Sequence, residues 1–116
     1  MKTSLTIGIP VKNEHGNILE LKKQISHLIK LEKYSQLEFE IVINDNLSVD
    51  GSTDLLRVWE ENESIVKLHT LETPLDFQAT VRDLMLKANG EGFALYQSDM
   101  QDPINVLEKG MFFNFF

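Results

Sequence analysis

Cysteine is absent from all 116 residues of the sequence. The chain therefore has no disulfide bonds, no zinc–thiolate site and no thiol nucleophile, which agrees with the cytoplasmic location that we predict. Positive charge is also scarce, because 11 lysine and arginine residues stand against 18 aspartate and glutamate residues, for a formal net charge of −7. Proteins that bind nucleic acids carry clustered positive charge, so we expect no nucleic-acid partner.

Long apolar runs are missing too. None approaches the roughly 20 residues that a membrane-spanning helix requires, and the apolar stretch 5–11 leads into charged and amide residues rather than into a signal-peptide cleavage site. The end of the chain is unusual, because four of the seven phenylalanines fall within residues 112–116. We predict an α/β domain over residues 1–110 and a Phe-rich tail over residues 111–116, where we expect a truncation point and a surface for homo-oligomer formation.

Several motifs that identify common active sites do not occur. The chain has no GxGxxG dinucleotide fingerprint, no GxxxxGK[ST] P-loop and no GxSxG nucleophile elbow. Its three histidines, His15, His27 and His69, lack the spacing of metal ligands, and we assign no role to His15 or His27. The sequence therefore gives no support to a dinucleotide-binding, P-loop or serine-hydrolase site.

Segments typical of β-strands alternate along the chain with segments of helical spacing. Strands are predicted over residues 5–11, 39–43, 65–68 and 92–96. Helices are predicted from an N-cap at Asn17 to about Tyr34, after residue 52, from an N-cap at Asp76 to Ala88, and over residues 103–109. This order predicts an α/β fold with a mostly parallel sheet and helices on both faces.

The second predicted helix shows how the buried faces are assigned. Leu55, Val58 and Trp59 recur at helical spacing, so we expect all three on its inner face. Trp59 at this spacing is more typical of a core residue than of a stacking surface for a ligand.

Polar residues follow three of the predicted strands. The loops concerned contain Asn13-Glu14, Asp45-Asn46 and Ser98-Asp99. Because the carboxyl ends of parallel strands meet at one edge of a sheet, we expect these loops to lie together and to bind a ligand there. Asp99 is the candidate ligand for a divalent cation, whereas Asp102, followed by Pro103, is typical of a helix N-cap.

Three segments carry a resemblance to a known family. Residues 6–14 (TIGIPVKNE), 40–52 (EIVINDNLSVDGS) and 97–103 (QSDMQDP) resemble the family patterns IPxYNE, EIIVVDDGSTDGT and DADLQDP, and residues 77–82 resemble its FGxxxAR helix. In this order, and at the ends of predicted strands, the segments resemble glycosyltransferase family 2, the inverting nucleotide-sugar transferases with a GT-A (Rossmann-like) fold. The resemblance implies that the chain is the N-terminal, donor-binding half of such an enzyme.

The resemblance also implies roles for single residues. Pro10 and the loop after it would border the nucleobase, Asp45 would accept a hydrogen bond from the base, and Arg82 would lie on the nucleotide side. Asp99 would coordinate a Mn²⁺ or Mg²⁺ ion that bridges the donor diphosphate. The expected nucleotide-binding residues are Pro10, Lys12, Asn13, Glu14, Asp45, Asn46, Arg82, Gln97 and Ser98.

The chain departs from the family pattern at three positions. Gln97 replaces the first aspartate of the DxD motif, which removes one charge from the expected metal site and leaves metal dependence open. Lys12 replaces an aromatic residue and supplies a cation that can meet a phosphate. Asp83 stands where asparagine often follows the arginine.

The function implied by the resemblance is sugar transfer from a nucleoside-diphosphate sugar, with UDP favoured over GDP, to an acceptor that the sequence does not identify. Cell-envelope polysaccharide or glycolipid synthesis is the expected setting, and the full-length form is expected to act in the cytoplasm at the membrane surface. The carboxylate base that deprotonates the acceptor is expected beyond residue 116. We therefore predict that this chain alone binds its donor weakly and transfers little or no sugar.

Other interpretations remain open. Asp45, Asn46 and Asp50 are also typical of turns and caps, and for Asp50 we consider a turn at least as well supported as a ligand role. A truncated transferase can serve as a non-catalytic nucleotide-binding or interaction module. A phosphoacceptor receiver domain has a similar length, but it requires an acidic pair after the first strand and a lysine after the last, which Asn13-Glu14 and Gln97 do not provide.

Overall fold

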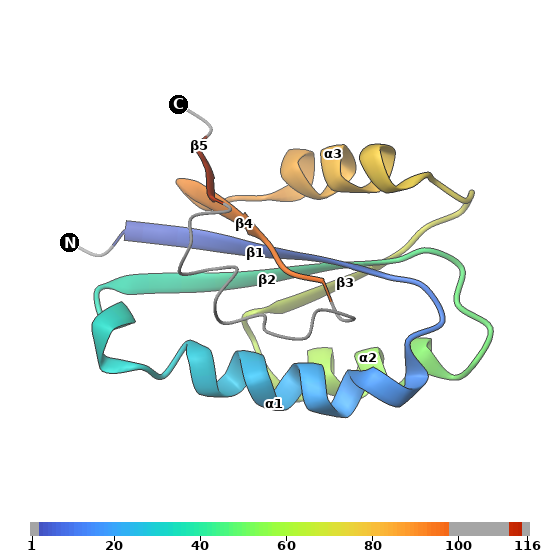
Figure 1. Ribbon diagram of the computed structural model, residues 1–116, viewed down its shortest axis with the longest axis horizontal. Coiled ribbons are helices and arrows are strands. Elements are labelled where there is room, and N and C mark those ends of the chain that lie inside the picture. The colour runs from blue at the N-terminus through green and yellow to red at the C-terminus, as the bar shows by residue number, and fades with distance from the viewer. Residues whose placement is uncertain (1–2, 98–111, 115–116) are drawn as a thin grey trace.

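The computed structural model of the chain describes residues 3–97 and 112–114 (Figure 1). Five strands form one sheet in the order β3-β2-β1-β4-β5. Their bounds are β1 (Thr3–Val11), β2 (Leu37–Asp45), β3 (Val66–Thr70), β4 (Gly92–Leu95) and β5 (Phe112–Asn114). The first four strands run parallel, and β5 pairs with β4 in the antiparallel direction.

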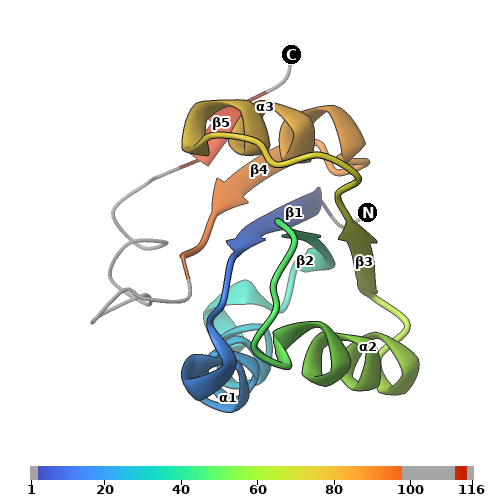
Figure 2. The same cartoon turned by 90° about the vertical axis from the view of Figure 1, so that its right-hand side faces the viewer.

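Three α-helices cover the two faces of the sheet. They are α1 (Ile18–Leu28), α2 (Ser52–Asn62) and α3 (Phe77–Lys87), and two 3-10 turns, η1 (His15–Asn17) and η2 (Glu32–Tyr34), flank α1. Helices α1 and α2 lie side by side on one face, and α3 lies on the other (Figures 1 and 2). The prediction of an α/β fold with a mostly parallel sheet and helices on both faces is therefore confirmed.

The alternation of side chains along the strands divides the interior into two cores. The larger core lies between the sheet and the α1/α2 layer, where the odd-numbered residues of β1 from Leu5 to Val11 meet Ile25 and Trp59. The smaller core lies under α3 and consists of Val42, Leu84, Phe93 and Leu95 with partly buried neighbours. The smaller core leaves room on the α3 side for polar groups between helix and sheet.

The first helix is shorter than predicted. It ends at Leu28, because the N–H groups of Lys30 and Leu31 donate to carbonyl oxygens three residues earlier, and Leu31 is extended. Such bonds tighten and end a helix. The predicted continuation to Tyr34 is therefore wrong, and a separate 3-10 turn takes its place.

Of three further predictions about helices, two are confirmed and one is wrong. Asn17 stands at the N-cap of α1 as predicted, although its side chain caps no N–H group and instead donates to Glu14 Oε2 at 2.7 Å. Val58 is 51% exposed rather than on the inner face of α2, which Leu56 and Trp59 occupy. Asp76 caps α3 as predicted, since its Oδ1 accepts the Ala79 N–H at 2.7 Å.

The end of the chain adds a strand that the sequence analysis did not predict. Phe112–Asn114 extends the sheet beside β4, while the predicted helix 103–109 lies outside the described residues. The predicted division of the chain at residues 110 and 111 stays a prediction. In the part of the chain that the structure describes, none of the helices is long and apolar enough to cross a membrane.

Candidate functional site

The loops after β1 and β2 lie at the same edge of the sheet and are bonded to each other. The Asn13 N–H donates to Ser48 Oγ at 2.9 Å, and Asn13 Oδ1 accepts the Val49 N–H at 2.7 Å. The Glu14 N–H donates to Ser52 Oγ at 3.0 Å. Asn13 adopts a φ of 52°, in the left-handed region that asparagine tolerates better than most residues. The two loops therefore act as one structural unit.

Asp50 belongs to this unit. Its carboxylate accepts bonds from the Ser52 hydroxyl, the His15 N–H and the Ser52 N–H. The Ser52 hydroxyl is the main reason that the pKa of Asp50 lies below its ordinary value. These contacts give Asp50 a role in the turn before α2.

Asp45 is buried at the end of β2, with a side chain that is 1% exposed. One carboxylate oxygen accepts the Ser48 N–H at 3.2 Å, and the other accepts the Thr53 hydroxyl. Both oxygens are thus engaged within the β2–α2 loop. Asp45, the predicted acceptor for the base, is not among the residues that line the pocket described below.

Asn46 joins three segments. Its N–H donates to the carbonyl oxygen of Val11 at 2.8 Å. Its side-chain amide donates to the carbonyl oxygen of Leu75 at 2.7 Å and accepts the Leu75 N–H at 3.2 Å. This pair of bonds, which we call the Asn46–Leu75 clasp, attaches the β3–α3 loop to the strand ends.

A pocket of about 290 Å³ opens at this edge of the sheet. Its lining residues are Pro10, Val11, Lys12, Glu14, Asn46, Leu75, Phe77, Thr80 and Gln97. Five of them, namely Pro10, Lys12, Glu14, Asn46 and Gln97, are among the residues predicted from the sequence. The pocket combines an apolar wall with one cation, one carboxylate and several amide and hydroxyl groups.

Four lining residues were not predicted from the sequence. Phe77 and Thr80 fall within the helix that resembles FGxxxAR, so that motif could have found them. Val11 was assigned only to a strand. Leu75 carries no signal in the sequence, because the long-range clasp with Asn46 brings it to the pocket.

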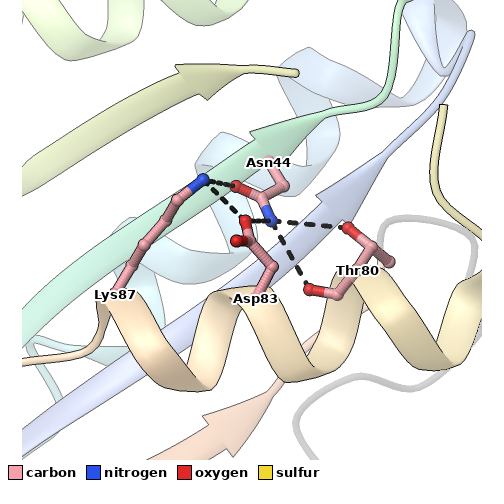
Figure 3. A network of polar contacts seen from close by, with 4 residues as sticks. All are labelled: Asn44, Thr80, Asp83 and Lys87. Atoms are coloured by element: carbon pink, nitrogen blue, oxygen red, sulfur yellow. Dashed lines mark hydrogen bonds and ion pairs between the residues drawn. The ribbon is translucent and has the colours of Figure 1, made fainter. Parts of the chain in front are cut away.

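A polar network holds α3 against β2 next to the pocket (Figure 3). Asn44 is fully buried, and its Nδ2 donates to Asp83 Oδ2 at 2.8 Å and to the carbonyl and hydroxyl oxygens of Thr80, both at 3.4 Å. Lys87 Nζ donates to Asn44 Oδ1 at 3.0 Å and lies 2.6 Å from Asp83 Oδ2. Because Thr80 also lines the pocket, this network positions the α3 side of its wall.

The network and its surroundings shift two pKa values. The hydrogen bond from Lys87 is the main reason that the pKa of Asp83 is lowered, and Asn44 adds to the effect. Partial burial is the main reason that the pKa of His69 on β3 is lowered, and the charge of Lys87 adds to it. At neutral pH the ion pair is therefore formed beside a neutral imidazole.

The remaining predicted site residues are Arg82, Ser98 and Asp99. Arg82 is exposed on α3 and is not among the pocket-lining residues. Ser98 and Asp99 lie outside the described residues. Within residues 3–97 and 112–114, no group of three histidine, aspartate or glutamate side chains could hold a metal ion, so the described residues do not by themselves fit the expected cation.

Comparison with protein families gives a match over most of the chain. The model of the family described as glycosyl transferase family 2 matches residues 6–112. No curated protein matches the sequence significantly.

Solved structures resemble the chain over part of their length. The chain superposes on TarS 1-349 from S. aureus with a TM-score of 0.68 and 25% identity, covering 85% of this chain and 28% of that one. TarS 1-349 in complex with UDP-GlcNAc gives a TM-score of 0.66 and 24% identity, covering 85% and 27%. The mannosyltransferase PcManGT from Pyrobaculum calidifontis, in complex with GDP-Man and Mn²⁺, gives a TM-score of 0.72 and 20% identity, covering 94% and 32%. The chain therefore spans about a third or less of these structures.

Proposed function

This chain belongs to glycosyl transferase family 2, and from that premise we propose that its pocket binds the nucleoside diphosphate of a nucleotide sugar, UDP in preference to GDP. The observation that carries the proposal is the pocket itself. It lies where ligands bind in open α/β sheets, beyond the carboxyl ends of the strands. Six of its lining residues come from the three segments that resemble the family's motifs: Pro10, Val11, Lys12 and Glu14 from the first, Asn46 from the second and Gln97 from the start of the third.

The chemistry of the lining supports this ligand. Pro10, Leu75 and Phe77 offer an apolar wall for a base, and the amides of Asn46 and Gln97 lie among the polar lining groups. Lys12 is exposed and brings positive charge into a chain whose net charge is −7, so it can offset part of the charge of a diphosphate. The complexes of TarS with UDP-GlcNAc and UDP support the preference for UDP, and that of PcManGT shows that a fold of this type can hold GDP-Man.

A divalent cation and the site near Asp99 belong to the same proposal. We propose Asp99 as a ligand for Mn²⁺ or Mg²⁺, supported by the Mn²⁺ in the PcManGT complex. When bound, such an ion neutralises charge on the departing nucleoside diphosphate. Gln97 contributes an amide in place of a carboxylate, so we expect the cation to bind more weakly than at a site with two aspartates.

Sugar transfer is proposed for the whole protein rather than for this chain alone. The acceptor and the general base that deprotonates it stay unassigned. A role in cell-envelope polysaccharide or glycolipid synthesis, in the cytoplasm at the membrane surface, remains part of the proposal, as does oligomer formation through the Phe-rich tail. The 116-residue chain should bind a nucleotide but transfer no sugar above the level of its Asp99→Ala variant.

Calorimetry tests the binding site directly. We expect UDP to bind the 116-residue chain more tightly than GDP or CMP, with Mn²⁺ strengthening the binding. Asp99→Ala should abolish the effect of Mn²⁺. A well-folded chain that binds none of the three nucleotides, with or without Mn²⁺, would contradict the proposal and favour the alternative of a non-catalytic interaction module.

Lys12→Met tests the pocket with a residue that the structure describes. Loss of one charge–phosphate contact should weaken UDP binding about tenfold and reduce its sensitivity to salt. Lys23→Met is the matched control, because Lys23 is exposed on α1 and is not among the pocket-lining residues. Equal affinities for the two variants would exclude a contact between Lys12 and the diphosphate.

A further inference from the structure

Phe77 is unusual among the aromatic residues of the domain because it is 53% exposed. Phe93, Trp59 and Tyr96, in contrast, are each no more than 1% exposed. Phe77 is also the only aromatic side chain among the described residues that line the pocket. An exposed ring on a concave wall is a surface that a ligand can cover.

The backbone around Phe77 is fixed on both sides. Asp76 caps α3 through the Ala79 N–H, and the Thr80 N–H donates to the Asp76 carbonyl oxygen at 2.9 Å. On the other side, the clasp to Asn46 holds Leu75. The backbone of Phe77 is therefore held in position without a ligand, which lowers the conformational entropy lost when a ligand binds to its ring.

Lys12 lines the same pocket and has a flexible, positively charged side chain. A cation suits a phosphate, while the flat face of a base is best covered by an aromatic ring. Lys12, in the loop after β1, is therefore suited to a phosphate, and Phe77, at the start of α3, is suited to a base.

We propose that the ring of Phe77 is the stacking surface for the nucleobase of the bound nucleotide. This inference rests on the proposed function, because it requires that a nucleotide occupies the pocket. Every base has a π-face, so stacking on Phe77 strengthens the binding of uridine and guanosine nucleotides alike. Phe77 thus contributes affinity for the base, and the polar lining groups are left to discriminate between bases.

The test compares ligands with and without a base. We measure binding of UDP, GDP and inorganic pyrophosphate, each with Mg²⁺, to the wild-type chain and to Phe77→Ala, Phe77→Leu and Phe77→Tyr. The alanine variant should bind UDP and GDP about tenfold more weakly and pyrophosphate unchanged. Phe77→Tyr should keep the wild-type affinity, and Phe77→Leu should fall between.

Leu86→Ala is the matched control, since Leu86 lies on the same helix, is 79% exposed and is not a pocket-lining residue. It should change none of the affinities. Thermal unfolding verifies that each variant is folded, and Phe77→Leu replaces the alanine variant if that one is not.

These measurements distinguish failure of the stacking role of Phe77 from failure of nucleotide binding by the pocket. If UDP and GDP bind the wild type and Phe77→Ala equally, the stacking role is overturned and the proposed function stands. If Phe77→Ala weakens pyrophosphate as much as UDP, Phe77 only shapes the pocket and the inference fails. If the wild type binds no nucleotide, the inference and the proposed function fall together.

Discussion

The amide and carboxylate side chains that follow β1 and β2 have much of their hydrogen-bonding capacity occupied by the protein itself. Asn13 accepts from Val49, Asp45 accepts from Ser48 and Thr53, and Asn46 both donates to and accepts from Leu75. Such residues are typical of ligand contacts and of turns alike. In this protein they mainly shape the loops, while Lys12 and Phe77 present their side chains to the pocket with large exposed surfaces.

The clasp between Asn46 and Leu75 makes Asn46 a residue on which stability depends. Asn46→Ala removes two hydrogen bonds from a side chain that is 9% exposed. Because the Leu75 backbone groups lose their partners, we expect the free energy of unfolding to fall by about 1–3 kcal/mol. Urea denaturation measures the loss.

Asn62→Ala is the control for this prediction. Asn62 Nδ2 also donates to a backbone carbonyl oxygen, that of Val58, but it does so on the exposed end of α2. Its loss should stay within about 0.5 kcal/mol. Equal losses in the two variants would show that the clasp contributes nothing beyond an ordinary surface hydrogen bond.

At the scale of elements, the contact between β1 and β4 requires a glycine. A Cβ atom added to Gly8 would lie 2.4 Å from two ring atoms of Phe93, which is fully buried under α3. Gly8→Ala should therefore destabilise the protein by about 1–3 kcal/mol through overpacking. Thermal and urea unfolding both measure this loss.

Two further variants test the cause of that loss. Gly16→Ala should be nearly neutral, since no atom lies within 4 Å of the added Cβ. Phe93→Leu removes part of the ring, so combining it with Gly8→Ala should cost less than the sum of the two single changes, by about 1 kcal/mol. Strict additivity of the two changes would rule out the ring as the origin of the effect.

Most of these elements could be predicted from the sequence, because periodicity and caps are local signals. The four parallel strands and the cap at Asp76 are examples. The end of α1 could not be predicted, because Ile29, Leu31 and Tyr34 continue an apolar pattern while packing on the core from a 3-10 turn. β5 was missed because the pairing of a short strand depends on its neighbour rather than on its own residues.

At the scale of the whole molecule, the sequence predicted which loops lie together better than which contacts their residues make. Strand ends converge by the rules of α/β folds, so several polar residues were correctly brought to one edge. Their partners are distant in sequence, since Ser48 lies 35 positions after Asn13 and Leu75 lies 29 positions after Asn46. No local pattern encodes such pairs, so the structural role of Asn13 was missed, and the turn role considered for Asn46 did not identify Leu75 as its partner.

Stability against acid is a property of the whole molecule that depends strongly on Glu40. Partial burial of Glu40 favours its neutral acid form and so raises its pKa. Its carboxylate, however, accepts hydrogen bonds from the Asn89 N–H and side chain, each at 2.9 Å, and from the Thr6 hydroxyl at 2.7 Å. These bonds outweigh the effect of burial and hold the pKa of Glu40 below its ordinary value. The pKa values of Asp83 and His69 are lowered too. In all three cases the folded state binds fewer protons than the unfolded state, so the stabilisation is complete only above the unfolded pKa values and is lost as the pH falls.

We therefore expect the free energy of unfolding to decrease as the pH is lowered from neutral, first through His69 and then, below about pH 5, through Glu40 and Asp83. Glu40→Gln should be less stable at neutral pH, because it loses charge-assisted hydrogen bonds, and its stability should fall less steeply below about pH 5. Urea denaturation at a series of pH values measures both effects. Glu38→Gln, at an exposed position near the start of the same strand, should follow the wild-type profile. A Glu40→Gln profile parallel to that of the wild type would mean that the carboxylate of Glu40 does not link β1, β2 and the α3–β4 turn in the way that its hydrogen bonds indicate.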